Sequence, residues 1–430
     1  MDSVKYLFQA RQLHIKTPVV DSHNDLAGEI LYRHNNGERN VIKRLYLHHW
    51  RAAHFKLIVS SIYIENSAFF PNHISSEEKK EYLNVPIADW QYYFHHDLLD
   101  WDSGWKEALS QIHHITQEIQ EASGDLMLVT TKNDLDELLQ NDKIGILLYM
   151  EGLDCIGNHL DRLNKLYQLG VRGASLTWSR QNLIATGCCT AARHIDIPGE
   201  LTDFGLQVIQ RMKELSMFLD ISHLNNEGFS QILSVWQSPL IATHSNAYSV
   251  YPNYRNLTDL QMKQLASQGG ILGLNACRYI VGNQALTEPD SSSSETRPYD
   301  SHISTYRDTV LDAMCEHIEY IVKTIGAKHV GYGFDLCDSY SLAKLTYESR
   351  IHHLPAPIRA GSPSVSDSEC LKSIEDFEGI KCFEPEDCLQ NHEEALFLTA
   401  RLLARGMEKE KVLLIIGLNW WNYFRTYLPE

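Results

Sequence analysis

Positive charge is scarce in this chain. It has 38 Lys and Arg against 55 Asp and Glu, which gives a formal net charge of −17. Proteins that bind nucleic acids usually present a basic surface that releases counterions from the phosphates, so we expect no nucleic-acid partner. The sequence also lacks a run of about 18 uninterrupted apolar residues, which a membrane-spanning helix needs. We therefore expect no membrane segment.

Signals for export or lipid attachment are missing as well. The first six residues contain no basic region followed by an apolar run. The apolar stretch 411–427 is interrupted by Asn419, Asn422 and Arg425, and no polar spacer with a hydrophobic tail follows it. The nine cysteines form no C-x-x-C pair and no regular framework, a pattern typical of free thiols in a reducing compartment. These features predict a cytoplasmic protein.

What the sequence does contain is an alternation of two patterns. Short apolar runs rich in β-branched residues recur between longer segments of helical periodicity, which is typical of parallel strands joined by crossover helices. We count eight such runs, at residues 18–21, 57–62, 145–150, 173–177, 217–222, 239–243, 270–275 and 329–335. The sequence therefore predicts an α/β fold of the (β/α)8 TIM-like barrel class. In such barrels the catalytic groups lie at the carboxyl ends of the strands.

The remaining patterns predict one barrel domain over residues 1–430. Residues 201–215 and 312–325 repeat apolar side chains at helical spacing. Residues 281–304 include four consecutive serines and are expected to form a loop. Residues 337–392 are rich in Pro, Ser and Asp, so we expect a long insertion after the eighth strand. Long loops of this kind often have a function, and two interpretations stay open, a lid over the barrel mouth and part of an interface.

Two potential metal ligands close the first predicted strand. His23 and Asp25 are two residues apart, so their side chains point to the same side of a strand. The spacing alone is weak evidence, because 21 His and 55 acidic residues in 430 give about 2.7 His-x-acid pairs by chance. Their position at a strand end makes the pair informative.

Three more side chains follow other predicted strands. Glu151 closes the third strand, His223 the fifth and His244 the sixth. Each has an ordinary alternative, since a histidine often makes a hydrogen bond at a barrel rim and an acid often lies at a helix N-terminus. A carboxylate can also bridge two cations. Imidazole and carboxylate ligands without thiolate suit Zn²⁺, with Mn²⁺ or Fe²⁺ as alternatives. The sequence therefore predicts a metal site at one barrel mouth.

The order of these motifs resembles the membrane (renal) dipeptidase family, metallopeptidases of the amidohydrolase superfamily. The matching segments lie in order along the chain, and the match spans the first predicted strand to the eighth. They are Asp21-Ser22-His23-Asn24-Asp25, Glu151-Gly152, Leu169-Gly170-Val171-Arg172, Leu176-Thr177, Leu201-Thr202-Asp203-Phe204-Gly205, Asp220-Ile221-Ser222-His223, Thr243-His244-Ser245-Asn246-Ala247 and Arg255-Asn256-Leu257.

The resemblance implies a zinc-dependent dipeptidase with two Zn²⁺ per chain. His23 and Asp25 would bind one ion, His223 and His244 the other, and Glu151 would bridge both together with a hydroxide that attacks the peptide bond. Family members are commonly homodimers, so a homodimer is expected here.

The resemblance also implies how a dipeptide binds. Arg255 would hold the free α-carboxylate of the substrate and Asp335 its free α-ammonium, which restricts hydrolysis to dipeptides. Trp178 stands where mammalian members have a histidine that stabilises the oxyanion, and its indole N–H can donate one hydrogen bond to the same charge. The eighth-strand motif, residues 331–338, also differs from the usual Asp-Phe-Asp-Gly, which leaves the substrate range open.

Two other functions stay open at this stage. One barrel fold hosts many reactions, so the chain could be a different amidohydrolase-type metal hydrolase, such as a deaminase or a lactonase. It could also be a catalytically impaired barrel that binds metal and serves as an assembly module. Hydrolysis of cyclic amides or esters without hydrolysis of dipeptides would favour the first alternative.

Overall fold

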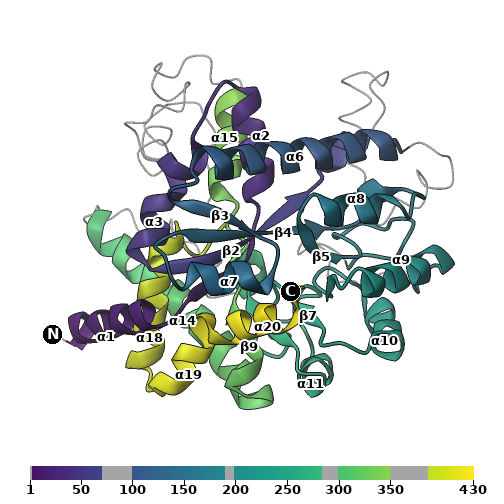
Figure 1. The fold of residues 1–430 in the computed structure, drawn as a ribbon. Coiled ribbons are helices and arrows are strands. Elements are labelled where there is room, and N and C mark those ends of the chain that lie inside the picture. Colours follow the sequence, from purple (N-terminus) through teal and green to yellow (C-terminus); the bar gives the residue numbers. More distant parts are fainter. Residues whose placement is uncertain (1, 70–98, 189–197, 283–298, 349–385) are drawn as a thin grey trace.

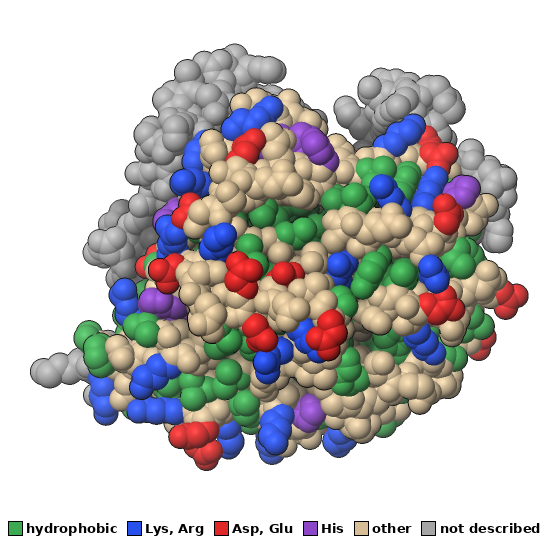
Figure 2. All heavy atoms as spheres, viewed as in Figure 1, with side chains coloured by type: hydrophobic (Ala, Val, Ile, Leu, Met, Phe, Trp, Pro, Cys, Tyr) green, Lys and Arg blue, Asp and Glu red, His purple; other side chains and the backbone are tan. Residues whose placement is uncertain are grey.

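A computed structural model describes residues 2–69, 99–188, 198–282, 299–348 and 386–430. Its strands lie at the centre and its helices surround them (Figure 1). Among the described residues, no helix is both long and apolar enough to cross a membrane. On the face drawn in Figure 2, acidic and basic side chains are interspersed.

The central sheet is a nearly closed parallel barrel. Its strand order is β1-β2-β4-β5-β6-β7-β8-β9, and every neighbouring pair is parallel. An isolated parallel bridge between Asn24 and Leu336 brings the end of β1 beside the chain that follows β9. The eight strands are β1 (Val19–Asn24), β2 (Phe55–Tyr63), β4 (Ile144–Glu151), β5 (Val171–Ser175), β6 (Phe218–Asp220), β7 (Ile241–Ala242), β8 (Ile271–Leu274) and β9 (Val330–Tyr332). The predicted (β/α)8 barrel is confirmed.

One strand was not predicted. β3 (Leu126–Val129) pairs with the first half of β4, while β5 pairs with the second half. The sheet therefore has nine strands in the described residues, and eight of them follow the barrel path. The apolar run Leu-Met-Leu-Val is only four residues long and half of it is partly exposed, so its pattern did not distinguish it from a loop.

The helices pack around the barrel. α1 and α18 lie side by side (Figure 1). The bounds are α1 (Asp2–Lys16), α2 (Leu26–Asn35), α3 (Leu47–Ala52), α6 (Trp101–Glu121), α7 (Lys132–Leu138), α8 (Arg162–Gln168), α9 (Asp203–Glu214), α10 (Asn226–Val235), α11 (Asp259–Ser267), α12 (Arg278–Val281), α14 (Tyr299–Ile325), α15 (Asp338–Glu348), α18 (Ala395–Ala404), α19 (Lys409–Leu413) and α20 (Asn419–Tyr427).

Side-chain caps fix where three of these helices begin. Thr202 accepts a hydrogen bond from the backbone N–H of Gly205 at the start of α9, and Asn225 accepts one from Gly228 at the start of α10. Thr258 forms a capping box with Gln261 at the start of α11. Such caps satisfy N–H groups that lack partners within the helix. They keep the loops between the strand ends and these helices in defined conformations.

Several predicted boundaries need correction. The helix predicted at 201–215 corresponds to α9, but the one predicted at 312–325 belongs to the longer α14. Residues 299–304 are therefore helical and not part of a loop 281–304, and Val281 ends α12. Tyr299, Ile303 and Tyr306 have helical spacing, which the serine-rich composition before them obscured. Residues 283–298 lie outside the described residues.

The insertion predicted at 337–392 begins with a helix. Residues 338–348 form α15, whereas residues 349–385 lie outside the described part of the chain. Beyond them, Asp387 accepts hydrogen bonds from the backbone N–H groups of Cys337 and Asp338, at 2.8 and 2.9 Å. The end of the insertion is thus attached to the loop that follows β9. Its role as a lid or an interface stays a prediction.

A close approach inside the barrel predicts a stability effect. A Cβ atom on Gly333 would lie 1.8 Å from Thr243 O and 2.5 Å from Ser22 Oγ. Since these atoms belong to buried strand ends, we expect Gly333→Ala to lower the free energy of unfolding by at least about 1–3 kcal/mol. Denaturant titration of Gly333→Ala and of Gly124→Ala, whose added Cβ would meet nothing within 4 Å, measures the difference. Equal stability of the two variants would contradict the prediction.

Candidate metal centre

The predicted metal ligands, and the predicted substrate residue Asp335, all lie at the carboxyl ends of barrel strands. The parallel arrangement places these ends at one mouth of the barrel, and the structure brings the side chains together there. His23 lies in β1 and Asp25 follows it, Glu151 is the last residue of β4, His223 comes three residues after β6, His244 two after β7, and Asp335 three after β9.

The ligand atoms form two groups that share Glu151. In one group, Glu151 Oε1 lies 3.0 Å from His223 Nε2 and 3.3 Å from His244 Nε2, and the two nitrogens are 2.9 Å apart. In the other, His23 Nε2 lies 3.5 Å from Glu151 Oε2 and 3.6 Å from Asp25 Oδ1. The two oxygens of one carboxylate therefore face different groups of ligand atoms.

These distances fit divalent cations. Two ligand atoms bound at about 2.0–2.1 Å to a tetrahedral Zn²⁺ lie about 3.3 Å apart, and the measured separations run from 2.9 to 3.6 Å. His23 Nε2 is buried and makes no hydrogen bond within the described residues, as expected of a nitrogen whose partner is an ion. His23, His244 and Asp335 form a third group of nearby ligand atoms, with Asp335 Oδ1 3.7 Å from His23 Nε2.

Burial and charge set the protonation of these groups. Burial lowers the pKa of His223 to about 3 and the pKa of His244 well below its usual value. Burial also opposes charge on His23 and Glu151, but their attraction outweighs it, so the pKa of His23 rises and that of Glu151 falls. The negative charge of Glu151 therefore favours positive charge at the point where the two ligand groups meet.

Two of the site residues have unusual backbone conformations. His223 has φ of 68° and Asp335 has φ of 59°, in the left-handed region that residues other than glycine rarely adopt. Gly152, directly after Glu151, has φ of 79°, and a Cβ atom there would lie 2.9 Å from the backbone N of Trp178. Strained backbone of this kind clusters at functional sites, which agrees with the position of the ligand groups.

A comparison with protein families identifies the chain. The sequence model of the membrane dipeptidase family, peptidase family M19, matches residues 7–352. The chain belongs to the membrane dipeptidase family.

Curated relatives of this family member are distant. An uncharacterized protein of Acinetobacter calcoaceticus is 27% identical over 212 residues, which are 49% of this chain and 62% of the relative. One of Klebsiella pneumoniae is 28% identical over 231 residues, 52% of this chain and 77% of the relative. An uncharacterized dipeptidase of Schizosaccharomyces pombe is 29% identical over 231 residues, 54% and 50% of the two chains. The chain thus spans less than two thirds of the first and third relatives.

Solved structures share the fold over almost the whole chain. A metallopeptidase of family M19, described as dipeptidase AC, is 21% identical with a TM-score of 0.64 and covers 96% of this chain and 99% of its own. A metallopeptidase from Rhodobacter sphaeroides, liganded with a phosphinate mimic of the dipeptide L-Ala-D-Ala, is also 21% identical, with a TM-score of 0.63 and the same coverage. At this identity the likeness establishes the barrel fold.

The predicted substrate residues of this dipeptidase-family chain lie beside the ligand groups. Arg255 is buried and donates a hydrogen bond from Nη2 to the carbonyl oxygen of His244, at 3.1 Å. Its charge contributes to the lowered pKa of His223 and His244, after burial. The Trp178 side chain is half-buried, and its ring centroid lies 5.8 Å from that of His223.

Asp335 is held by a neighbour. Asn275 Nδ2 donates a hydrogen bond to Asp335 Oδ2 at 2.9 Å, which leaves Oδ1 on the side of His23. Burial raises the pKa of Asp335 to about 7, while the nearby charge of His23 opposes that rise. The carboxylate is therefore positioned at the mouth by a residue that the sequence analysis did not select.

Sequence reasoning also missed two acidic residues beneath the ligands. Asp21 accepts a hydrogen bond from the backbone N–H of Phe334 at 2.9 Å and lies 2.8 Å from His392 Nε2. Asp220 accepts hydrogen bonds from Tyr149 and Thr243. Each acid precedes a predicted ligand by two or three residues, in Asp21-Ser-His and Asp220-Ile-Ser-His. An aspartate shortly before each of these histidines was the signal available in the sequence.

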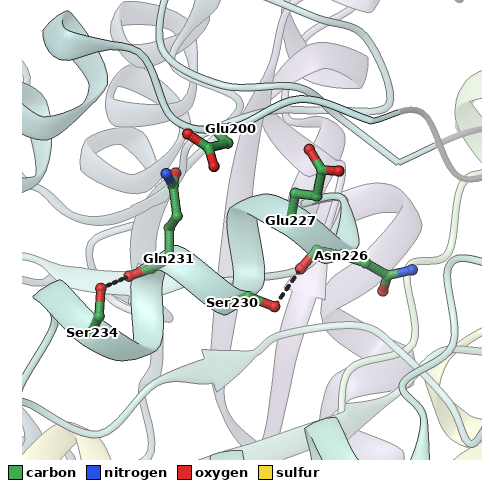
Figure 3. A pocket seen from close by; sticks show the side chains of 6 residues that line it. All are labelled: Glu200, Asn226, Glu227, Ser230, Gln231 and Ser234. Carbon is green, nitrogen blue, oxygen red and sulfur yellow. Dashed lines mark hydrogen bonds between the residues drawn. The ribbon is translucent and has the colours of Figure 1, made fainter.

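A separate surface hollow of about 390 Å³ lies along α10 (Figure 3). Its lining includes Glu200, Glu227 and Gln231, and Ser230 and Ser234 donate hydrogen bonds to the backbone of the same helix. Among the described residues, its lining includes no histidine or cysteine, and none of these lining residues belongs to the ligand groups at the mouth. The candidate centre is therefore the barrel mouth.

Proposed function

We propose that this chain is a binuclear zinc dipeptidase. The proposal rests on the orientation of the Glu151 carboxylate. Its Oε1 faces His223 and His244, while its Oε2 faces His23. His23 and Asp25 hold one ion, His223 and His244 hold the other, and Glu151 serves both. Ions in such a pair lower the pKa of water to near neutrality, which supplies a nucleophile, and they polarise a carbonyl group.

The other predicted residues bind the substrate. Arg255 holds the α-carboxylate through charge-assisted hydrogen bonds, and Asp335 holds the α-ammonium with the carboxylate that Asn275 orients. Trp178, beside His223, donates its indole N–H to the carbonyl oxygen as negative charge develops there. A site that grips both ends of its substrate favours dipeptides over longer peptides.

Metal analysis combined with a substrate panel tests this function. We expect about two zinc ions per chain and hydrolysis of dipeptides, lost on chelation and restored by Zn²⁺. The panel should include D-configured C-terminal residues, because the Rhodobacter sphaeroides structure was liganded with a mimic of L-Ala-D-Ala. Cyclic amides and esters serve as contrast substrates. Less than one metal ion per chain, or hydrolysis of the contrast substrates alone, would overturn the proposal.

The single-domain organisation, the homodimer and the cytoplasmic location stay predictions. Sedimentation velocity of the full chain measures the oligomeric state directly. A mass near 49.3 kDa would contradict the homodimer.

A further inference from the structure

One hydroxyl group lies between the two groups of ligands. Thr243 Oγ1 is 2.8 Å from His244 Nδ1 and 3.3 Å from His23 Nδ1. It is also 2.5 Å from Asp220 Oδ2. Thr243, His244 and His23 are all fully buried, so solvent does not supply alternative partners for these atoms. The hydroxyl therefore contacts the far side of two histidines that belong to different ligand groups.

The partners of Asp220 determine where the hydroxyl hydrogen goes. Asp220 Oδ1 accepts hydrogen bonds from the backbone N–H groups of Ser222 and Thr243, at 2.8 and 3.0 Å. Oδ2 accepts one from the Tyr149 hydroxyl at 2.5 Å. A carboxylate is an acceptor only, and a hydroxyl has one hydrogen and two lone pairs. Thr243 must therefore donate its single hydrogen to Asp220 Oδ2.

This assignment fixes the role of both imidazoles. Since the Thr243 hydrogen is committed to Asp220, the oxygen offers only lone pairs to His23 and His244. Each ring must then carry a hydrogen on Nδ1, and its Nε2 presents a lone pair to the ligand group. A hydrogen bond to one ring nitrogen in this way sets the tautomer and the orientation of a histidine ligand.

We propose that Thr243, held by Asp220, is a positioning residue for both metal ions. The inference rests on the metal centre proposed above and deepens it, since one hydroxyl serves a ligand of each ion. The hydrogen bonds from each histidine to Thr243, and from Thr243 to Asp220, orient the ligands from behind. Removing a contact of this kind typically lowers metal affinity about 10- to 100-fold. Loss of the hydroxyl should weaken the binding of both zinc ions. Loss of a contact to only one histidine would weaken the binding of one ion.

Metal affinity of Thr243→Val tests the proposal. Valine keeps the shape of threonine and removes only the hydroxyl, so we expect the affinity for Zn²⁺ to fall about 10- to 100-fold at both steps. Competition against a chromophoric chelator measures it without any assay of hydrolysis. Thr243→Ser retains the hydroxyl and should restore affinity to near the wild-type value.

Thr399→Val is the matched control. Thr399 is also fully buried, and its hydroxyl lies 2.8 Å from His14 Nε2 and 2.8 Å from the Tyr332 hydroxyl. It contacts no residue of the ligand groups, so its removal should cost stability and leave zinc affinity unchanged. Thermal unfolding of each metal-free variant shows whether the fold is retained.

The outcomes separate this inference from the metal centre on which it rests. Unchanged affinity in Thr243→Val, or weakened affinity that Thr243→Ser does not restore, would overturn the role of Thr243 while wild-type binding upholds the centre. A wild-type chain that takes up no zinc would overturn the centre and the inference together. Weakening at both steps, with Thr399→Val like wild type, supports the proposal.

Discussion

Glu151→Gln is expected to remove both metal ions and to lower dipeptide hydrolysis by at least about 10³-fold. Replacing a residue that only hydrogen-bonds a metal ligand typically lowers metal affinity or activity about 10- to 100-fold. Glu151 is itself a ligand and serves both ions, so its loss should cost more. Glutamine has the shape of glutamate but only one carbonyl oxygen, so its NH₂ group must face one of the two ligand groups. The substitution also removes the negative charge that lies 3.0 Å from His223 Nε2 and 3.5 Å from His23 Nε2.

Zinc content after gel filtration and the rate of dipeptide hydrolysis measure this effect. Glu121→Gln, an exposed residue at the end of α6, is the control for loss of one negative charge and should behave as wild type. If Glu151→Gln retained two zinc ions per chain and near-wild-type hydrolysis, the shared carboxylate would have no place in the mechanism.

The sequence predicted the barrel because its strands have a strong and simple pattern. Runs such as residues 145–150 are apolar throughout, as expected for a strand buried on both faces. A polar residue directly after such an apolar run is not explained by packing in the core. Glu151 and His244 were recognised as candidates for this reason. The positions of the candidate ligands therefore followed from local sequence and from the general geometry of parallel barrels.

The contacts behind the ligands could not be predicted in the same way. Asp220 on β6 meets Thr243, which follows the neighbouring β7, and Tyr149, which lies on β4 two strands away, only because the barrel brings these strands together. His392 reaches Asp21 from 371 residues away, across the whole chain. No local sequence pattern indicates such pairs. An aspartate or threonine that hydrogen-bonds a metal ligand looks the same in the sequence as one that caps a turn.

Local pattern also failed where it was weak. β3 is too short for its apolar run to stand out, and the serine-rich composition before Tyr299 hid the start of α14. Asp335 was selected because of the family resemblance. Its left-handed backbone conformation could not be predicted from the sequence around it. The structure thus adds the orientation of the groups to positions that the sequence had placed.

Arg255→Met should raise KM for dipeptides with a free carboxylate by about 10- to 100-fold and change kcat little, because hydrogen bonds to a charged group are each worth about 1.5–3 kcal/mol. Methionine retains much of the apolar stem of the buried arginine while removing the guanidinium. Steady-state kinetics with a dipeptide and its C-terminally amidated form measure the effect. The amidated form lacks the partner charge, so its KM should be nearly the same for both enzymes.

The control for this experiment is Arg211→Met, on α9 away from the ligand groups, where Arg211 pairs with Glu214. Arg211→Met should leave KM and kcat unchanged for both the free and the amidated dipeptide. Arg255 also donates a hydrogen bond to the carbonyl oxygen of His244, so it could act by holding that histidine. Equal losses on the free and the amidated dipeptide, with kcat reduced, would show that Arg255 acts through His244 and not through the substrate carboxylate. A loss confined to the free dipeptide and to KM assigns it to the substrate.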